Sequence, residues 1–158
     1  MAPTTPYTPQ LEGQDPIAAM RASVRRFEKL LSWTPEQLER PYAPGKWTAR
    51  QVLVHLAQTE IALGSRARFA LSTPDYTSQG FDQDAWFPHD AGLGAHDAVR
   101  VLLALIPMNA SMYAGLSQPQ RETPFTHPEY GPLTVEWILY QQAGHHIHHL
   151  KQLESMTS

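Results

Sequence analysis

Apolar residues recur at intervals of three and four positions along four long segments of this 158-residue sequence. That spacing places them on one face of an α-helix, and no stretch of useful length shows the strict alternation of a half-buried strand. The four segments run from 16 to about 33, from 49 to about 71, from 95 to about 116 and from 135 to about 156. Helices of this kind bury their apolar faces against one another, so the sequence predicts an all-α, four-helix bundle.

Capping residues mark where these helices begin. Asp15 is an N-cap residue followed by proline at the first helical position. Thr48 and Gln51 form a capping-box pattern, and Thr134 is placed to cap the last helix. Pro107 lies inside the third helix and is predicted to kink it, because its ring clashes with the carbonyl group four residues earlier.

The segments between the helices differ in length and composition. Residues 1–14 contain three prolines among threonine and glutamine, which predicts a flexible N-terminal lead-in before a single domain over residues 15–158. Residues 72–94 form a connection that is long for a compact domain, and such connections often serve a functional site. Trp86 lies in this connection and is a candidate to contact a substrate. Residues 117–133 form a second irregular stretch.

The composition excludes several classes of site and partner. The chain contains no cysteine, so it forms no disulfide and can hold a metal only through nitrogen or oxygen. Its 12 lysine and arginine residues form no basic stripe and its formal net charge is -3, which argues against a nucleic-acid partner. The sequence shows no signal-peptide pattern and no uncharged apolar stretch of roughly 18 residues, so we expect a cytoplasmic protein without a membrane segment.

Histidine is both frequent and clustered. Four of the eight histidines fall between positions 145 and 149, in the last predicted helix. His145 and His149 are four residues apart, so both imidazoles project from the same helical face, a spacing typical of metal ligands. Unpartnered imidazoles inside a bundle cost roughly 1–3 kcal/mol each, and a metal would remove that cost. The pairs His145 with His148 and His146 with His149 have a suitable spacing too, and a solvated helix face is the alternative without a metal.

His55 is the best candidate for a third ligand. It lies on the inward face of the second predicted helix, between Val52 and Leu56. Three histidine ligands leave a coordination position open for water or substrate, as in catalytic rather than structural metal sites. A single histidine on an apolar stripe is also common as a hydrogen-bonded core residue, so its position alone does not decide between the two.

Three short motifs resemble the DinB/YfiT-like superfamily. GKWT at 45–48 followed by VLVHL at 52–56 is similar to one signature of that family, and HPEYGPLT at 127–134 resembles the segment before its last helix. GHHIHHLKQL at 144–153 is similar to the last-helix pattern of a histidine, three residues and a second histidine. The resemblance covers nearly the whole chain from about Asp15, in order and in spacing.

The resemblance implies a four-helix bundle with up-down-down-up connections and a divalent metal between the second and fourth helices. It places the ligands at His55, His145 and His149, and it implies zinc or nickel as the metal. Characterised members of the superfamily include thiol S-transferases that use bacillithiol or mycothiol, a thiol-dependent isomerase, and proteins assigned only as metal-dependent hydrolases. Many members are dimers, so the resemblance also implies a homodimer.

These observations lead to two hypotheses of function. The first is a metal-dependent enzyme, a thiol S-transferase or a hydrolase, that activates a thiol such as bacillithiol, or water, toward a small-molecule substrate. The alternative is a non-catalytic, stress-associated metal-binding or interaction bundle. Members of the family often carry an acidic residue one turn after the first histidine; Gln58 and Thr59 stand there in this chain, followed by Glu60, so the identity of any general base stays open. The candidates for the substrate pocket are Gln58, Thr59, Trp86, Gln142 and Gln152.

Overall fold

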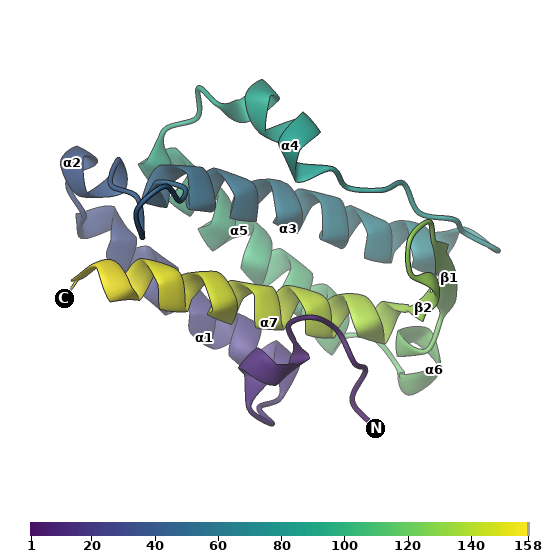
Figure 1. The fold of residues 1–158 in the computed structure, drawn as a ribbon. Coiled ribbons are helices and arrows are strands. Elements are labelled where there is room, and N and C mark those ends of the chain that lie inside the picture. Colours follow the sequence, from purple (N-terminus) through teal and green to yellow (C-terminus); the bar gives the residue numbers. More distant parts are fainter. Residues whose placement is uncertain (158) are drawn as a thin grey trace.

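The computed structural model describes residues 1–157; Ser158, the last residue of the predicted domain, lies outside the described part. Four long helices form the body of the molecule (Figure 1): α1 (Pro16–Glu28), α3 (Ala49–Ser72), α5 (Ala95–Ala114) and α7 (Val135–Glu154). Shorter elements connect and flank them: η1 (Thr8–Leu11), η2 (Lys29–Ser32), α2 (Pro35–Leu38), α4 (Gln83–Trp86), η3 (Phe87–Asp90), α6 (Gln118–Arg121), β1 (Pro124–His127), β2 (Gly131–Thr134) and η4 (Ser155–Thr157).

The helices have the predicted up-down-down-up arrangement. In Figure 1, α1 and α7 run in one direction along the bundle, and α3 and α5 run in the other. Helix α1 packs against α5 and α7, and α3 packs against the same two helices, which places α1 and α3 on opposite corners. Because α3 and α5 are parallel, the chain must return along the bundle between them. That return explains the length of the connection at 73–94, which carries α4 and η3 (Figure 1).

The predicted capping residues begin their helices as expected. The Asp15 carboxylate accepts a hydrogen bond from the backbone N–H of Ala18, and the Thr134 hydroxyl accepts one from Trp137. Thr48 and Gln51 form a complete capping box. The first helix ends earlier than predicted, because α1 tightens into the 3-10 turn η2 after Glu28. Helix α5 continues through Pro107 to Ala114.

A short β-hairpin departs from the purely helical expectation. Strands β1 and β2 are antiparallel, with Pro124 opposite Thr134 and His127 opposite Gly131. Each strand has four residues, too few to show an alternating pattern in the sequence, which is why this stretch was predicted as irregular. Gly131 follows the turn with a φ of 72°, in the left-handed region that glycine adopts without strain.

The core contains a hydrogen-bonded group of polar side chains, which we call the polar cluster. Its five members are Glu60 from α3, Asn109 and Tyr113 from α5, and Gln142 and His146 from α7. The Glu60 carboxylate is hydrogen-bonded to His146 Nε2, and it accepts hydrogen bonds from Asn109 Nδ2 at 2.7 Å and from Gln142 Nε2 at 3.3 Å. The Tyr113 hydroxyl donates to Gln142 Oε1. All five side chains are buried, so these contacts supply most of the partners that water would otherwise provide, with His146 Nδ1 left without one.

The N-terminal segment, for which the sequence predicts a flexible lead-in, packs against α7 in the structure. Leu11 of η1 is buried, and the backbone carbonyl of Thr4 accepts a hydrogen bond from Trp137 Nε1 at 3.2 Å. The contact depends on Gly144, because a Cβ added there would lie 2.2 Å from the backbone oxygen of Tyr7. The absence of a side chain in the middle of α7 therefore lets a second stretch of backbone approach the helix.

We expect Gly144→Ala to displace this segment. Alanine is favoured over glycine in a helix by about 1 kcal/mol, but the overpacking against Tyr7 should outweigh that gain and lower the free energy of unfolding by about 1–3 kcal/mol. Limited proteolysis should then cut within residues 1–14 faster than in the original protein. Gly92→Ala is the matched control, because nothing lies within 4 Å of a Cβ at position 92. Equal proteolysis of both variants would contradict the proposed contact.

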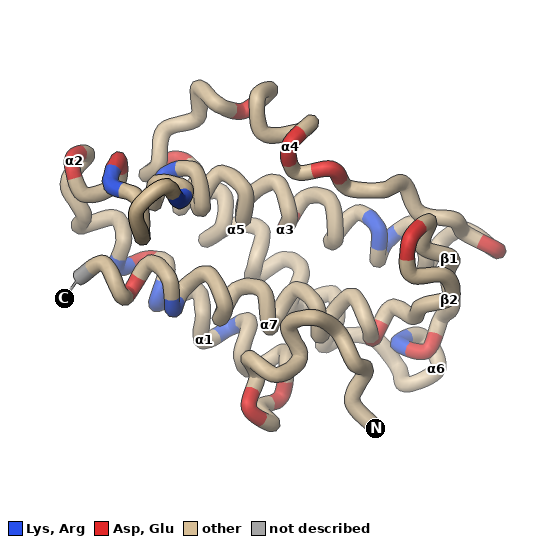
Figure 2. The backbone as a smooth tube through the Cα atoms, in the orientation of Figure 1, with Lys and Arg blue, Asp and Glu red and all other residues tan. Residues whose placement is uncertain are grey.

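Charged residues are mixed in sign over the described surface. Figure 2 shows acidic and basic positions mainly near the ends of the bundle and in the connections, with few along the middle of α3 and α7. Within residues 1–157, no single helix combines the length and apolar character needed to cross a membrane. Only the strongly bent pair formed by Gln83–Asp90 and Ala95–Ala114 meets those criteria jointly, and α5 is a core helix of the bundle.

Candidate metal centre

Three buried imidazoles meet between α3 and α7. His55 Nε2 lies 3.2 Å from His145 Nε2, which lies 2.9 Å from His149 Nε2. One ligand atom from each ring falls within 4.8 Å of the other two. The three side chains, called the histidine triad below, are 5%, 5% and 8% exposed. Of the pairings left open by the sequence, the structure brings His145 and His149 to His55.

Helix geometry explains this convergence. His145 and His149 lie one turn apart on α7, and His55 lies on the inward face of the facing helix α3. Aromatic rings enclose the triad: Trp47 lies edge-on to His55 with a centroid distance of 5.2 Å, and Tyr7 lies 4.9 Å from His145. The GKWT motif and the N-terminal segment therefore both contribute walls to the site.

Burial keeps the triad in its neutral form. It lowers the pKa of His55 from 6.5 to about 4, and it lowers the pKa of His149 to about 3 against the opposing effect of a hydrogen bond to Gln152. Burial, reinforced by the neighbouring histidines, also lowers the pKa of His145 well below its usual value. Neutral imidazole is the form that binds metal ions, so the rings are ready to act as ligands at neutral pH.

The hydrogen bonds of the triad fit a metal ion better than they fit a self-contained network. His149 Nδ1 donates to Gln152 Oε1 at 2.7 Å, which leaves a lone pair on His149 Nε2. A single N–H on His145 Nε2 cannot satisfy both neighbouring nitrogens, whereas a metal accepts lone pairs from all three. Ligands at about 2.0–2.1 Å in a tetrahedral site are separated by about 3.3 Å, close to the spacings observed. The three residues therefore fit a divalent metal.

The lowered pKa of His55 predicts a pH-dependent stability for the metal-free protein. The unfolded chain takes up a proton near pH 6.5, whereas the folded chain does so only near pH 4. Stability is thus complete above pH 6.5 and falls as the pH decreases toward 4. Between pH 7 and pH 5, His55 alone should lower the free energy of unfolding by about 2 kcal/mol.

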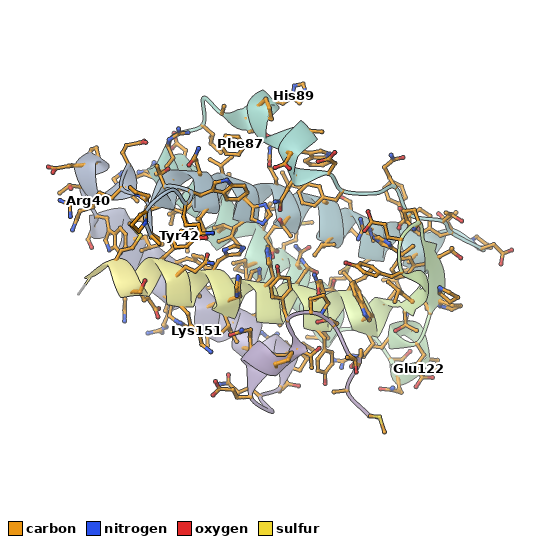
Figure 3. The ribbon with its side chains drawn as sticks, viewed as in Figure 1. Arg40, Tyr42, Phe87, His89, Glu122 and Lys151 are labelled. Atoms are coloured by element: carbon orange, nitrogen blue, oxygen red, sulfur yellow. The ribbon has the colours of Figure 1, made fainter. Side chains whose placement is uncertain are left out.

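Urea denaturation at the two pH values measures this loss. The exposed His89 supplies the control, because His89→Gln should leave the difference unchanged while His55→Gln reduces it. A pH dependence that is identical in both variants would contradict the burial effect. Figure 3 shows His89 at the outer edge of η3, away from the bundle.

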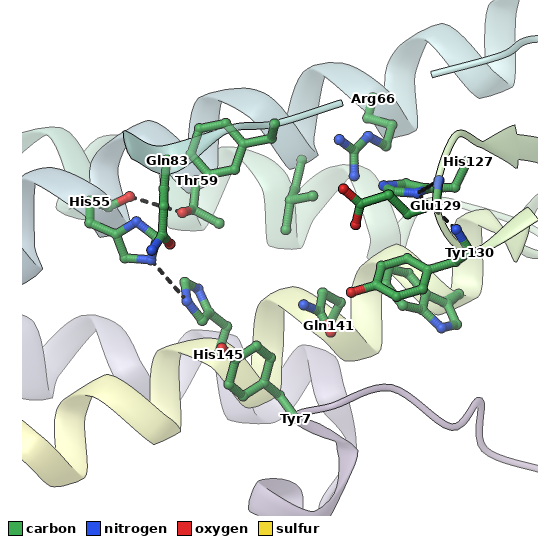
Figure 4. A pocket seen from close by; sticks show the side chains of 13 residues that line it. Tyr7, His55, Thr59, Arg66, Gln83, His127, Glu129, Tyr130, Gln141 and His145 are labelled. Carbon is green, nitrogen blue, oxygen red and sulfur yellow. Dashed lines mark hydrogen bonds between the residues drawn. The ribbon is translucent and has the colours of Figure 1, made fainter. Parts of the chain in front are cut away.

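Two cavities open onto the triad. The first cavity, of about 230 Å³, is lined by His55 and His145 and extends along the interface between α3 and α7 (Figure 4). The second cavity, of about 350 Å³, reaches His55 and His149 from the side of Trp47 and Tyr42. Tyr7 and Gln83 line both cavities. The triad can therefore be approached from two directions.

The predicted pocket residues are divided among several places. Thr59 lines the first cavity, and its hydroxyl donates to the backbone carbonyl of His55 at 2.9 Å. Gln152 lines the second cavity and orients His149. Gln58 instead holds the long connection on α3, because its amide donates to the backbone oxygen of Trp86 at 3.0 Å and to Asp90 Oδ2 at 2.7 Å.

The structure places Trp86 and Gln142 away from the first cavity. Trp86 lines a neighbouring apolar pocket on the outer face of α3, where it packs edge-on against Phe81. Gln142 belongs to the polar cluster and is fully buried. Glu60 belongs there as well, so the acidic residue that follows His55 does not face the triad.

Several residues that line the first cavity were not among the predicted site residues. Tyr7 comes from the segment predicted to be flexible, and Arg66 and Gln141 extend the inward faces of α3 and α7. His127 accepts hydrogen bonds from the hairpin backbone through its Nδ1, is 7% exposed and lines the cavity with Glu129. Arg66 follows His55 by eleven residues, about three turns of α3, so the two side chains lie on nearly the same helical face. This spacing is the one sequence signal that could have indicated part of the wall.

Comparison with known proteins places this fold and site in a family. The family model of the DinB superfamily matches residues 19–153. A protein of Oceanobacillus iheyensis, provisionally named as a metal-dependent hydrolase, is 27% identical over 135 residues, 85% of this chain and 78% of that protein. A second protein of that organism with the same provisional name is 30% identical over 122 residues, 77% of this chain and 71% of that protein.

Two solved structures have the same architecture. YfiT from Bacillus subtilis, described provisionally as a metal-dependent hydrolase with an unusual four-helix bundle topology, superposes with a TM-score of 0.81 at 23% identity, over 90% of this chain and 83% of that one. The mycothiol-dependent maleylpyruvate isomerase superposes with a TM-score of 0.70 at 12% identity, over 87% of this chain and 59% of that one. Since the family model spans most of the sequence and the bundle topology agrees, this chain belongs to the DinB superfamily.

Proposed function

We propose that this protein is a metal-dependent enzyme that transfers a low-molecular-weight thiol to a small electrophilic substrate, with His55, His145 and His149 as the metal ligands. The observation that supports this most is the pair of cavities that meet at the triad. A structural metal site is closed by four protein ligands, whereas three ligands beside open space leave room for a reactant. Two separate approaches suit a reaction between two organic molecules.

The metal chemistry and the side chains have distinct roles in this proposal. When bound, a divalent metal lowers the pKa of a coordinated thiol or water, which makes a nucleophile available near neutral pH. Gln152 fixes the ring of His149, and Thr59 is tied to the backbone of His55. Burial raises the pKa of Tyr7, so its phenol keeps its proton and can donate a hydrogen bond to a reactant in either cavity. Trp47 and Tyr7 limit the access of bulk water.

Hydrolysis is the second candidate, supported by the provisional names of the relatives and by the same open position. In that case water takes the place of the thiol and an ester or amide enters the first cavity. The mycothiol dependence of the structural neighbour favours the thiol reaction. Zinc or nickel remains our proposal for the metal, because three nitrogen ligands suit both ions.

Elemental analysis of the purified protein combined with a conjugation assay tests both candidates. Monochlorobimane is offered as the electrophile with bacillithiol, mycothiol, glutathione or no thiol, and p-nitrophenyl acetate is offered in the arm without thiol. We expect stoichiometric metal and conjugation with one thiol at a rate at least tenfold above that of His149→Ala. Ester hydrolysis that depends on His149, without conjugation by any thiol, would replace the transferase with the hydrolase. Metal-free protein without either activity after reconstitution would contradict both.

A further inference from the structure

The end of the first cavity away from the triad contains a buried positive charge. Arg66 of α3 lines the cavity and is only 6% exposed. Its Nη2 donates to the backbone oxygen of Gln79 at 3.0 Å, and within residues 1–157 no carboxylate forms an ion pair with it. A guanidinium carries five N–H donors, and one carbonyl uses only part of that capacity. Burying a charge without an opposite partner is costly, so this position is suited to receive an anion.

His127 adds a second donor at the same end. Its Nδ1 accepts hydrogen bonds from the backbone N–H groups of Glu129 at 3.0 Å and Tyr130 at 3.3 Å. The proton of the neutral ring is therefore on Nε2, which makes that atom a hydrogen-bond donor. Burial and the nearby charge of Arg66 lower the pKa of His127, so the ring stays neutral at pH 7. Figure 4 shows Arg66 and His127 together at the end of the cavity opposite His55.

Glu129 is the acidic side chain in the lining of this cavity, and it is exposed at the rim. Figure 4 shows its carboxylate near Arg66, but none of the ion pairs within residues 1–157 joins the two. An exposed carboxylate keeps much of its hydration and gives little stabilisation to a buried cation. The carboxylate of Glu129 would repel an incoming anion weakly. Removing its charge should therefore strengthen the binding of an anionic ligand, which provides a control for the charge of that ligand.

We propose that Arg66 and His127 form a carboxylate-binding subsite, so that one of the molecules reacting at the triad carries an anionic group at its far end. This inference rests on the proposed function for the reacting end of the cavity. His55 and Arg66 are eleven positions apart on α3, about 16 Å along the helix axis. Both side chains lean toward the helix N-terminus and arginine is the longer, which leaves on the order of 10 Å between the reacting atom and the carboxylate.

The aromatic rings in the cavity wall indicate the character of the ligand between its two ends. Four aromatic rings line the cavity: Tyr7 and Phe81 lie beside the triad, Tyr130 lies beside His127, and Trp137 lies beside Tyr130. Aromatic walls of this kind suit an aromatic or extended apolar spacer. The substrate class is therefore an elongated, amphipathic carboxylate rather than a compact neutral molecule.

Calorimetric titration of the metal-free protein with phenylacetate and its neutral isostere phenylacetamide tests the subsite without the metal. We expect phenylacetate to bind at least about tenfold more tightly, because a charged hydrogen bond to guanidinium is lost in the amide. Arg66→Gln should abolish the preference, Arg66→Lys should keep part of it, and Glu129→Gln should strengthen phenylacetate binding severalfold. Equal binding of the two probes, no binding of either, or a preference that survives in folded Arg66→Gln would overturn the proposal.

A second titration shows which molecule carries the carboxylate. Cobalt-substituted protein is mixed with 8-mercaptooctanoate or 8-mercaptooctanol, and thiol binding is followed by the visible absorption of cobalt. If the thiol carries the anionic group, the carboxylate form binds at least tenfold more tightly, and only in protein with Arg66. If the electrophile carries the anionic group, the two thiols bind equally and phenylacetate still binds beside them. Either of these two outcomes supports the subsite. Absence of a cobalt signal with any thiol would contradict the proposed function, while the metal-free titration still decides the subsite.

Discussion

His149→Ala is expected to abolish stoichiometric binding of a divalent metal while leaving the helical content nearly unchanged. Alanine removes one of three nitrogens that meet within a few ångströms, and it sits well in the middle of α7. Loss of a residue that only orients a ligand typically lowers metal affinity by 10–100-fold, so the loss of a ligand should exceed about 100-fold. Competition with a chelator gives the affinity, and circular dichroism gives the helical content.

His148→Ala is the matched control for this experiment. His148 belongs to the same histidine run and lines the second cavity, but it is not one of the three converging rings. Its variant should keep the affinity of the original protein to within a few-fold. Full metal content in His149→Ala, or equal losses in the two variants, would reject the assignment of the ligands.

Glu60→Ala is expected to cause a large loss of stability without removing the metal site. The carboxylate accepts hydrogen bonds from His146, Asn109 and Gln142, and all of these side chains are buried. Its removal leaves their polar atoms without a partner, and breaking a buried pair of this kind costs about 3–5 kcal/mol. Chemical denaturation of the metal-free protein measures the loss.

Glu28→Ala provides the comparison, because Glu28 is an exposed glutamate at the end of α1 and its removal should change stability by less than about 0.5 kcal/mol. In the double variant of Glu60 and His146, the total loss of stability should be smaller than the sum of the losses in the two single variants, since both substitutions break the same hydrogen bond. Metal affinity in Glu60→Ala should remain within a few-fold of the original. A loss of stability below about 1 kcal/mol would contradict the role of the polar cluster.

The position of Glu60 also bears on the general base. Successive residues of an α-helix are separated by about 100°, so five residues after His55 place Glu60 about 140° away around α3. Glu60, the acidic residue that follows His55 on α3, therefore points into the core of the bundle. In this chain the groups that face the triad and can hold a proton come from elsewhere, notably Tyr7 of the N-terminal segment.

The same helical arithmetic shows why one predicted stripe on α7 contained residues that the structure places in two different sites. His145 and His149 differ by about 40° in direction, so their shared face was readable from the sequence. Gln142 lies about 60° from His145 on the same side as His149, and about 40° from His146, with which it shares the polar cluster. A stripe drawn through every third or fourth residue includes residues that face the triad and residues that face the polar cluster. Only the packing of the neighbouring helices decides which residue belongs to which site.

By itself, the sequence determined the properties that depend on neighbours along the chain. Capping side chains and apolar periodicity act within a few residues, so the four long helices and most of their first residues could be predicted. Tertiary structure alone decided the contacts between distant segments: the seat of Tyr7 against Gly144, the polar cluster around Glu60, and the meeting of Arg66 with His127 in one cavity. These contacts depend on how the helices rotate and pack against one another, and no local pattern encodes that rotation.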